Sequence, residues 1–164
     1  MVTAALPFGA LIYGMVFGAF DYNIKRIRLA FSNLPKSFDG LRIVQISDIH
    51  SGSFVETHHL QRAIDMVNGQ KADIISFTGD LVNSKTDEVY PYLDVLKQVH
   101  APMGVYASLG NHDYGDYYDW PSHEDKVNNL AALFEVYQKI GWDLLLNENR
   151  ILTRNGEQIA LAGC

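Results

Sequence analysis

Three short polar motifs recur along the chain at intervals of about 30 residues, close to the length of one strand–helix–strand unit. Each follows an apolar run, as expected for buried strands of a parallel sheet. Because the carboxyl ends of parallel strands meet at one edge of the sheet, we expect the three motifs to converge there. The motifs are Asp48-Ile49-His50, Gly79-Asp80-Leu81-Val82-Asn83 and Gly110-Asn111-His112-Asp113, and the preceding runs are Leu41–Ser47, Asp73–Thr78 and Val105–Leu109.

The residue types in these motifs indicate a metal site. Carboxylate, imidazole and amide groups form a mixed oxygen and nitrogen ligand set, which suits manganese, iron or zinc better than calcium. A thiolate site is excluded because Cys164 is the only cysteine. Two such ions, roughly 3.5–4 Å apart, can bind the attacking and leaving oxygens of a displacement reaction. Asp80, in the central motif, is the natural carboxylate to bridge them.

In these motifs the chain resembles the calcineurin-like metallophosphoesterase superfamily, including its membrane-associated bacterial members. A single Asp-x-His is usually just a polar turn, but three ordered motifs at strand ends are specific. The resemblance implies that Asp48 and His50 bind one divalent metal ion, that Asp80 bridges both ions and that Asn111 binds the second. It also implies that a metal-activated hydroxide attacks phosphorus and that His112, supported by Asp113, is the general acid.

Two departures from the family pattern refine this expectation. Asn83 stands where purple acid phosphatases carry tyrosine, so the ferric purple subtype is disfavoured. The family continues with further histidine motifs that complete the metal shells, and His58, His59, His100 and His123 have the wrong neighbours for them. We therefore interpret residues 21–164 as the amino-terminal part of a metallophosphoesterase domain, inactive by itself and incomplete at its carboxyl end.

The first 20 residues differ from the rest. Residues 1–20 contain no charged side chain, and about 20 apolar residues can span a bilayer. Gly14 and Gly18 add a small-residue face of the kind that packs membrane helices together, whereas Pro7 weakens a helix. We therefore predict a transmembrane helix over residues 1–20; a buried helix of a soluble protein and a signal peptide remain alternatives.

Residues just after this segment bear on membrane orientation. Lys25, Arg26 and Arg28 follow the apolar segment, and the positive-inside rule then places the catalytic domain in the cytoplasm. Alternatively, Ile24–Phe31 is an alternating edge strand whose basic residues face water.

The remaining segments predict an α/β fold, a layered metallophosphoesterase-like sheet with flanking helices. Apolar periodicity and terminal signals predict helices over Thr57–Asn68 and about Glu88–Val99, and a third that begins at Ser122 and stops before Gly141. Strands are expected at Trp142–Leu146 and Ile151–Leu161, the latter turning at Asn155-Gly156.

These observations favour a phosphodiesterase or phosphomonoesterase acting on a phosphate ester, with a lipid-linked phosphate as the natural substrate of a membrane-attached enzyme. The formal charge of −6 argues against a nucleic-acid partner, whose binding surfaces are usually basic. Bound metal ions would still attract an anionic substrate. The aromatic loop Tyr114–Trp120 directly follows the third motif and either contacts substrate or simply packs on the fold. The alternative function is a catalytically inactive, phosphoesterase-like interaction module.

Overall fold

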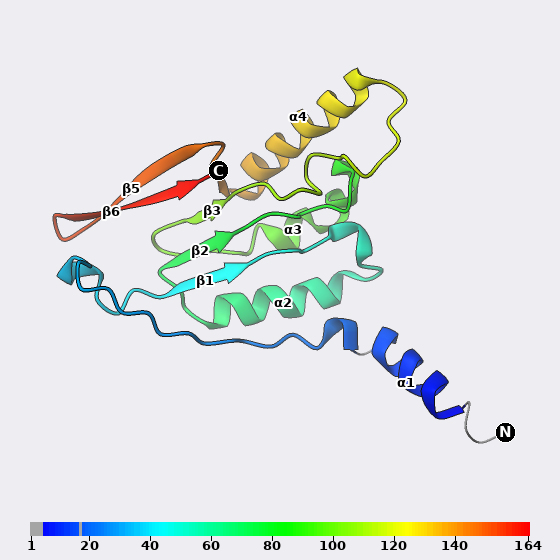
Figure 1. Ribbon diagram of the computed structural model, residues 1–164, viewed down its shortest axis with the longest axis horizontal. Coiled ribbons are helices and arrows are strands. Elements are labelled where there is room, and N and C mark those ends of the chain that lie inside the picture. Colours follow the sequence, from blue (N-terminus) through cyan, green and yellow to red (C-terminus); the bar gives the residue numbers. More distant parts are fainter. Residues whose placement is uncertain (1–4, 17) are drawn as a thin grey trace. The chain divides into compact units, whose positions relative to one another are not determined.

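The computed structural model describes residues 5–16 and 18–164, which form two separate units, residues 1–32 and Asn33–Cys164 (Figure 1). In the first unit, helix α1 (Ala5–Val16) is followed by a short 3-10 turn, η1 (Gly18–Phe20). Residues 21–31 form neither helix nor strand, so the edge strand considered for Ile24–Phe31 is wrong.

The predicted transmembrane helix over residues 1–20 is not found. Within the described residues, no helix combines the length and apolar character needed to cross a bilayer. Helix α1 has 12 residues, and at 1.5 Å per residue it is about 18 Å long, against about 30 Å of hydrocarbon. The prediction rested on the number of consecutive uncharged residues. The helix itself ends at Val16, before Gly18.

The second unit is built on a parallel sheet, as the sequence predicts, which has four strands in the order β1-β2-β3-β4. Figure 1 shows β1, β2 and β3 running side by side in one direction, so their carboxyl ends meet at one edge. The strands are β1 (Ile43–Ile46), β2 (Ile74–Phe77), β3 (Val105–Ala107) and β4 (Asp143–Leu144). Central strand β2 is almost fully buried, whereas edge strand β1 is partly exposed.

Three α-helices and three 3-10 turns connect these strands, and a fourth turn, η2, precedes β1. The α-helices are α2 (Thr57–Gly69), α3 (Leu93–Leu96) and α4 (His123–Ile140). The turns are η2 (Lys36–Phe38), η3 (Ser51–Ser53), η4 (Thr86–Glu88) and η5 (Tyr90–Tyr92). Helices and sheet share one buried apolar cluster, which includes Leu60, Phe77, Leu96, Tyr137 and Trp142.

Two of the three predicted α-helices are confirmed. Helix α4 begins after Ser122, whose hydroxyl accepts a hydrogen bond from Asp125 N at 3.1 Å, and it ends at Gly141 in the left-handed conformation. Helix α2 matches its predicted range. The helix predicted over Glu88–Val99 is instead divided into η5 and the short α3, with Pro91 inside the turn. Proline has no N–H to donate, so it interrupts regular helix there.

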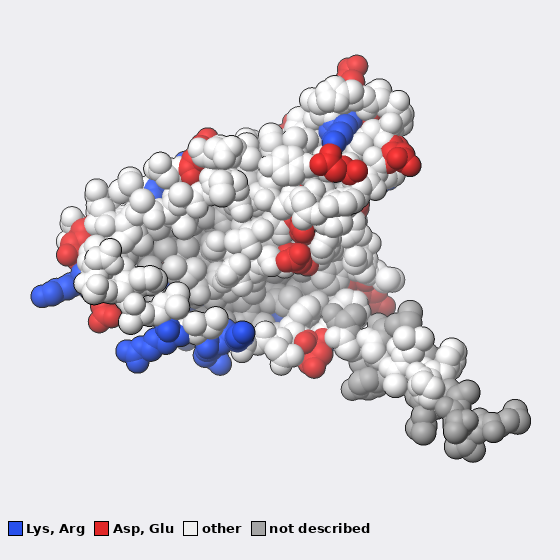
Figure 2. Space-filling view, viewed as in Figure 1, with Lys and Arg blue, Asp and Glu red and all other residues white. Residues whose placement is uncertain are grey.

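The chain continues into an antiparallel hairpin of β5 (Glu148–Arg154) and β6 (Glu157–Gly163). Its turn lies at Asn155-Gly156, as predicted, and both residues have positive φ, as a two-residue hairpin turn requires. The strand predicted over Trp142–Leu146 is reduced to the two residues of β4. On the face shown in Figure 2, acidic side chains are scattered among uncharged residues of this unit.

Candidate metal centre

The first two motifs leave their strands through left-handed backbone. Asp48, His50 and Asp80 have φ values of 54°, 48° and 62°. Hydrogen bonds between the two loops continue the β1–β2 pairing past the strand ends: Asp48 N donates to Gly79 O at 2.9 Å, and His50 N donates to Asp80 O at 3.0 Å. Because the loops are bonded to each other, the side chains that they carry have fixed relative positions.

The second and third motifs meet at two glycines. Gly79 has a φ of 97°, and a Cβ placed on it would collide with the backbone of Gly110. A Cβ on Gly110 would collide with the Asp80 carboxylate and would lie 2.6 Å from Asp80 N. The glycines therefore allow the β2 and β3 loops to approach closely enough to bring Asp80 beside Asn111 and His112.

Possible ligand atoms of three predicted site residues lie close together, and Asp48 lies beside one of them. His50 Nε2 lies 3.9 Å from Asp48 Oδ1 and 4.0 Å from Asp80 Oδ2. Possible ligand atoms of His50, Asp80 and His112 all lie within 4.8 Å of one another. Donors bound to one zinc-like ion lie about 2.0–2.2 Å from it, so two of them can be at most about 4.4 Å apart. The separations of 3.9 and 4.0 Å lie within that limit, a separation of 4.8 Å would have to shorten on binding, and the donor chemistry fits a divalent metal.

Burial increases from the rim of this cluster toward its base. The side chain of Asp48 is 64% exposed, that of His50 28% and that of Asp80 11%. Asp80 is also anchored, because its Oδ1 accepts a hydrogen bond from His112 N at 2.9 Å. The residue expected to bridge two ions is thus the most deeply buried of the three, while Asp48 borders solvent.

His112 is held through its Nδ1 atom, which lies 2.7 Å from the carbonyl oxygen of Asn83. A carbonyl only accepts hydrogen bonds, so Nδ1 carries the proton and Nε2 is the remaining ring nitrogen. The His112 and His50 rings form a T-shaped contact, with centroids 4.8 Å apart. His112 is therefore placed either to ligate a metal through Nε2 or to donate a proton from it.

Asp113 has a different environment from the one expected beside a general acid. It is fully buried, and its carboxylate accepts backbone hydrogen bonds from Asp80, Leu81, Val82 and Gly110. Burial raises the pKa of Asp113, and the four backbone donors oppose that rise. The carboxylate thus joins the β2 and β3 loops to each other, and it is the Asn83 carbonyl that contacts the His112 ring.

Two further residues were not predicted to contribute to the site. Glu88 accepts backbone hydrogen bonds from Asn83, Ser84 and Lys85 at 2.5, 3.1 and 2.9 Å, which fixes the loop that presents the Asn83 carbonyl. Tyr117 stacks on His112, with ring centroids 4.4 Å apart, and accepts a hydrogen bond from Asn111 Nδ2 at 2.8 Å. The sequence indicated an aromatic loop here without identifying the residue that contacts the site.

Beneath the site lies the phenol of Tyr137, a buried residue of α4. It is buried, and burial raises its pKa well above the ordinary range; the nearby charges of Asp113 and Asp80 act in the same direction. Tyr137 therefore stays neutral and packs with Phe77 and Trp142.

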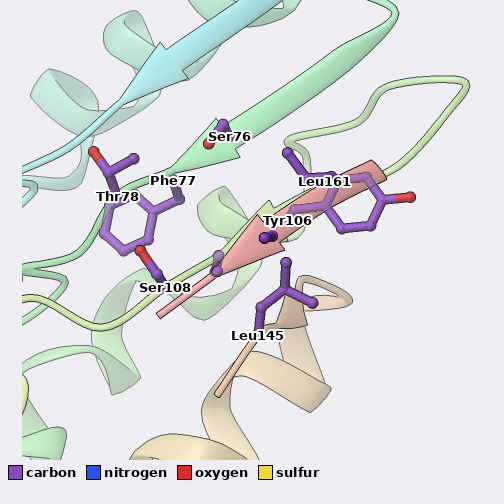
Figure 3. A pocket seen from close by; sticks show the side chains of 10 residues that line it. Ser76, Phe77, Thr78, Tyr106, Ser108, Leu145 and Leu161 are labelled. Atoms are coloured by element: carbon purple, nitrogen blue, oxygen red, sulfur yellow. The ribbon is translucent and has the colours of Figure 1, made fainter. Parts of the chain in front are cut away.

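A separate hollow lies on the sheet between β2, β3 and β6 (Figure 3). Ser76, Tyr106, Leu145 and Leu161 are among the residues that line it, and the three motifs contribute none of its walls. The metal cluster and this hollow are thus distinct features of the same sheet.

The fold and site together define an α/β protein with a mixed histidine and carboxylate centre at the carboxyl edge of a parallel sheet. The chain belongs to the calcineurin-like phosphoesterase family, which it matches over residues 41–161. This match confirms the family resemblance of the sequence, and the matched residues include all three motifs.

Individual relatives come from animals and bacteria. A transmembrane protein with metallophosphoesterase domain from Danio rerio is 31% identical over 99% of this chain and 35% of its own length. The UDP-2,3-diacylglucosamine pyrophosphatase LpxG of Chlamydia trachomatis is 37% identical over 68% of this chain and 35% of its own. An uncharacterized metallophosphoesterase of Bacillus subtilis is 32% identical over 69% of this chain and 42% of its own.

Among solved structures, a phosphopantetheinyl hydrolase from Mycobacterium tuberculosis is similar, with a TM-score of 0.49 and 20% identity. The similarity covers 74% of this chain and 41% of that one. The chain thus spans well under half the length of these relatives.

Proposed function

We propose that this chain contributes the first three ligand-bearing loops of a metal-dependent phosphoesterase, which hydrolyses phosphodiesters or phosphomonoesters. The observation that carries the proposal is the convergence of His50, Asp80 and His112 within 4.8 Å, from three strand ends far apart in sequence. Parallel-sheet enzymes place their ligands at this edge. Because the chain spans only part of its relatives, the activity is proposed for the whole protein.

Each residue of the centre has a proposed role. Asp48, His50 and Asp80 would hold one divalent ion of manganese, iron or zinc, and Asp80 with Asn111 would contribute to a second. When bound, such ions supply an activated water and neutralise charge on the phosphate oxygens. The burial of these side chains supports the roles, because Asp48 would reach an ion from the solvent side and Asp80 from the sheet edge.

His112 is proposed to protonate the leaving oxygen. Its Nδ1–H donates to Asn83 O, so Nε2 is the nitrogen that can carry the transferred proton. The main-chain carbonyl of Asn83 would thus hold the His112 ring, a role that the sequence suggested for the Asp113 carboxylate.

A leaving-group comparison tests the proposed acid. In the full-length protein, His112→Ala should lower turnover of an alkyl phosphate ester by about 10²- to 10⁴-fold, because general-acid catalysis contributes that much when the leaving oxygen is basic. Turnover of a nitrophenyl ester should fall far less, since that leaving group departs without a proton.

Metal content, measured on the same samples, separates acid from ligand. It should be unchanged in His112→Ala, whereas Asp80→Ala should lose bound metal together with activity. Equal loss on both esters, accompanied by loss of metal, would make His112 a ligand and remove it from the acid role. Intact metal binding with no turnover of any ester by the unaltered protein would favour an inactive interaction module.

The proposed substrate class is a lipid-linked phosphate, met at a membrane through residues 1–20. Two observations support this step: the uncharged amino-terminal segment, and relatives whose names include a transmembrane protein and a pyrophosphatase of diacylglucosamine. An acylated substrate stays in the bilayer, so an enzyme attached there meets it at high local concentration.

A further inference from the structure

We infer that Tyr117 is a positioning residue of the metal centre, one that orients the Asn111 amide and the His112 ring together. The inference rests on the proposed function, because it assigns Tyr117 a role toward the ligand and the acid proposed there. Tyr117 touches both residues at once, through its hydroxyl group and through its ring face.

The hydroxyl contact determines which end of the Asn111 amide is available. Asn111 Nδ2 donates to the Tyr117 hydroxyl oxygen at 2.8 Å. An amide group has a donor end and an acceptor end, and only the oxygen end can ligate a metal. By binding the nitrogen end, Tyr117 leaves Oδ1 as the free end and disfavours the flipped amide, in which nitrogen would replace oxygen at the metal.

The ring contact restrains the proposed acid. The Tyr117 and His112 rings lie 26° from parallel with centroids 4.4 Å apart, which is a stacked arrangement. The His112 ring also meets Asn83 O at Nδ1 and makes a T-shaped contact with His50. Three contacts from three different loops therefore hold the imidazole, and Tyr117 provides the stacked one.

Packing of the core does not explain the position of Tyr117, since this residue is 63% exposed. Its loop is nevertheless anchored: Trp120 Nε1 donates to Gly115 O at 2.7 Å, the Tyr118 ring packs against Trp120, and Lys126 pairs with Asp116. Tyr118 interacts with Trp120 and with Lys85 rather than with the motif residues. It is therefore a matched control for Tyr117 within the same loop.

Two substitutions in the full-length protein separate the two contacts. Tyr117→Phe removes the hydroxyl and keeps the stack, whereas Tyr117→Leu removes both; Tyr118→Phe, which keeps the ring that packs on Trp120, is the control. Binding of Mn²⁺, measured by calorimetry, should weaken by about two- to tenfold in both Tyr117 variants, the range expected for one hydrogen bond. Tyr118→Phe should bind Mn²⁺ as the unaltered protein does.

A spectroscopic readout follows the stack independently of activity. The ring-proton chemical shifts of His112 should move in Tyr117→Leu, which loses the ring current, and stay close to the original in Tyr117→Phe. The ratio of alkyl-ester to nitrophenyl-ester turnover should fall in Tyr117→Leu and be retained in Tyr117→Phe. A purely structural role would not produce this division between the two variants.

The outcomes distinguish this inference from the proposed function. Unchanged Mn²⁺ affinity together with unchanged His112 shifts in both Tyr117 variants would overturn the inference. If the unaltered protein binds Mn²⁺ but hydrolyses no ester, the proposed function fails, while Mn²⁺ affinity and the His112 shifts still decide the role of Tyr117. If the unaltered protein does not bind Mn²⁺, both fail.

Discussion

Asp113 is a fully buried acid whose two oxygens are occupied by backbone donors. Those donors come from the β2 loop and from Gly110 in the β3 loop, so one side chain fixes the relative position of two loops. The proposed metal ligands Asp80 and Asn111 are carried by these same loops. Asp113 therefore acts on the site through the backbone, and its removal should affect folding before it affects proton transfer.

Asp113→Asn should lower the free energy of unfolding by about 2–3 kcal/mol, because the amide nitrogen would face backbone N–H donors and leave them unpaired. Chemical denaturation of the metal-free protein measures this effect. Asp119→Asn is the control, since Asp119 is an exposed acid of the following loop. If the two variants are equally stable, the four backbone bonds of Asp113 contribute little to folding.

Which residues would converge could be predicted from sequence, but their contacts could not. Position after a buried strand was enough to bring Asp48, His50 and Asp80 together, because parallel topology dictates where strand ends lie. The roles of Asn83 O, Glu88 and Tyr117 depend on loop conformation. Main-chain oxygens are present at every residue, so sequence does not single out the carbonyl that contacts His112.

At the scale of elements, the β2 and β3 loops fit together only because Gly110 has no side chain. The backbone of Gly110 does not have positive φ, so other residues could adopt its conformation. What excludes a side chain here is the close contact with neighbouring atoms. A Cβ there would meet the Asp80 side chain and backbone nitrogen. The third motif therefore requires glycine at position 110, because a side chain there would collide with the carboxylate of Asp80, a proposed metal ligand.

Gly110→Ala should displace the Asp80 carboxylate and reduce Mn²⁺ affinity by at least about tenfold, the equivalent of 1.4 kcal/mol. Gly69→Ala is the matched control, because a Cβ at the end of α2 meets no atom within 4 Å. Calorimetry on both variants makes the comparison. Retention of full Mn²⁺ affinity by Gly110→Ala would show that the loops can separate without moving the ligand.

Elements with strong local signals were predicted well. Helices α2 and α4 have apolar periodicity and clear terminal residues, and the β5–β6 turn has Asn155-Gly156. The segment around Pro91 was predicted poorly. Its apolar residues keep a helical spacing on both sides of Pro91, but the proline itself interrupts the helix. Strand β4 is short because pairing with β3 ends after two residues, a tertiary property that local sequence does not encode.

At the scale of the whole molecule, the two units have different compositions. Residues 1–20 carry no charge, whereas the second unit has the mixed surface of a globular domain. Helix α1 exposes apolar side chains such as Phe8 and Leu11. We therefore expect the amino-terminal unit to determine whether the protein associates with membranes.

If residues 1–20 attach the protein to a bilayer, the full-length protein should stay in the membrane fraction after alkaline carbonate washing. A variant that begins at Asp21 should move mostly to the soluble fraction while keeping its Mn²⁺ affinity, because all proposed ligands lie in the second unit. Immunoblotting of the two fractions provides the measurement. Release of the unaltered protein by the wash would instead favour a buried helix.

The left-handed residues at the strand ends also carry a cost in stability. Half of the non-glycine residues with positive φ in the described chain are Asp48, His50 and Asp80. Glycine would adopt this backbone without steric cost, whereas an L side chain costs about 1–2 kcal/mol there. Net stabilities of domains are only about 5–15 kcal/mol. Replacing these residues with glycine would relieve the strain and remove the donor side chains at the same time, so the strain is concentrated at the proposed metal centre.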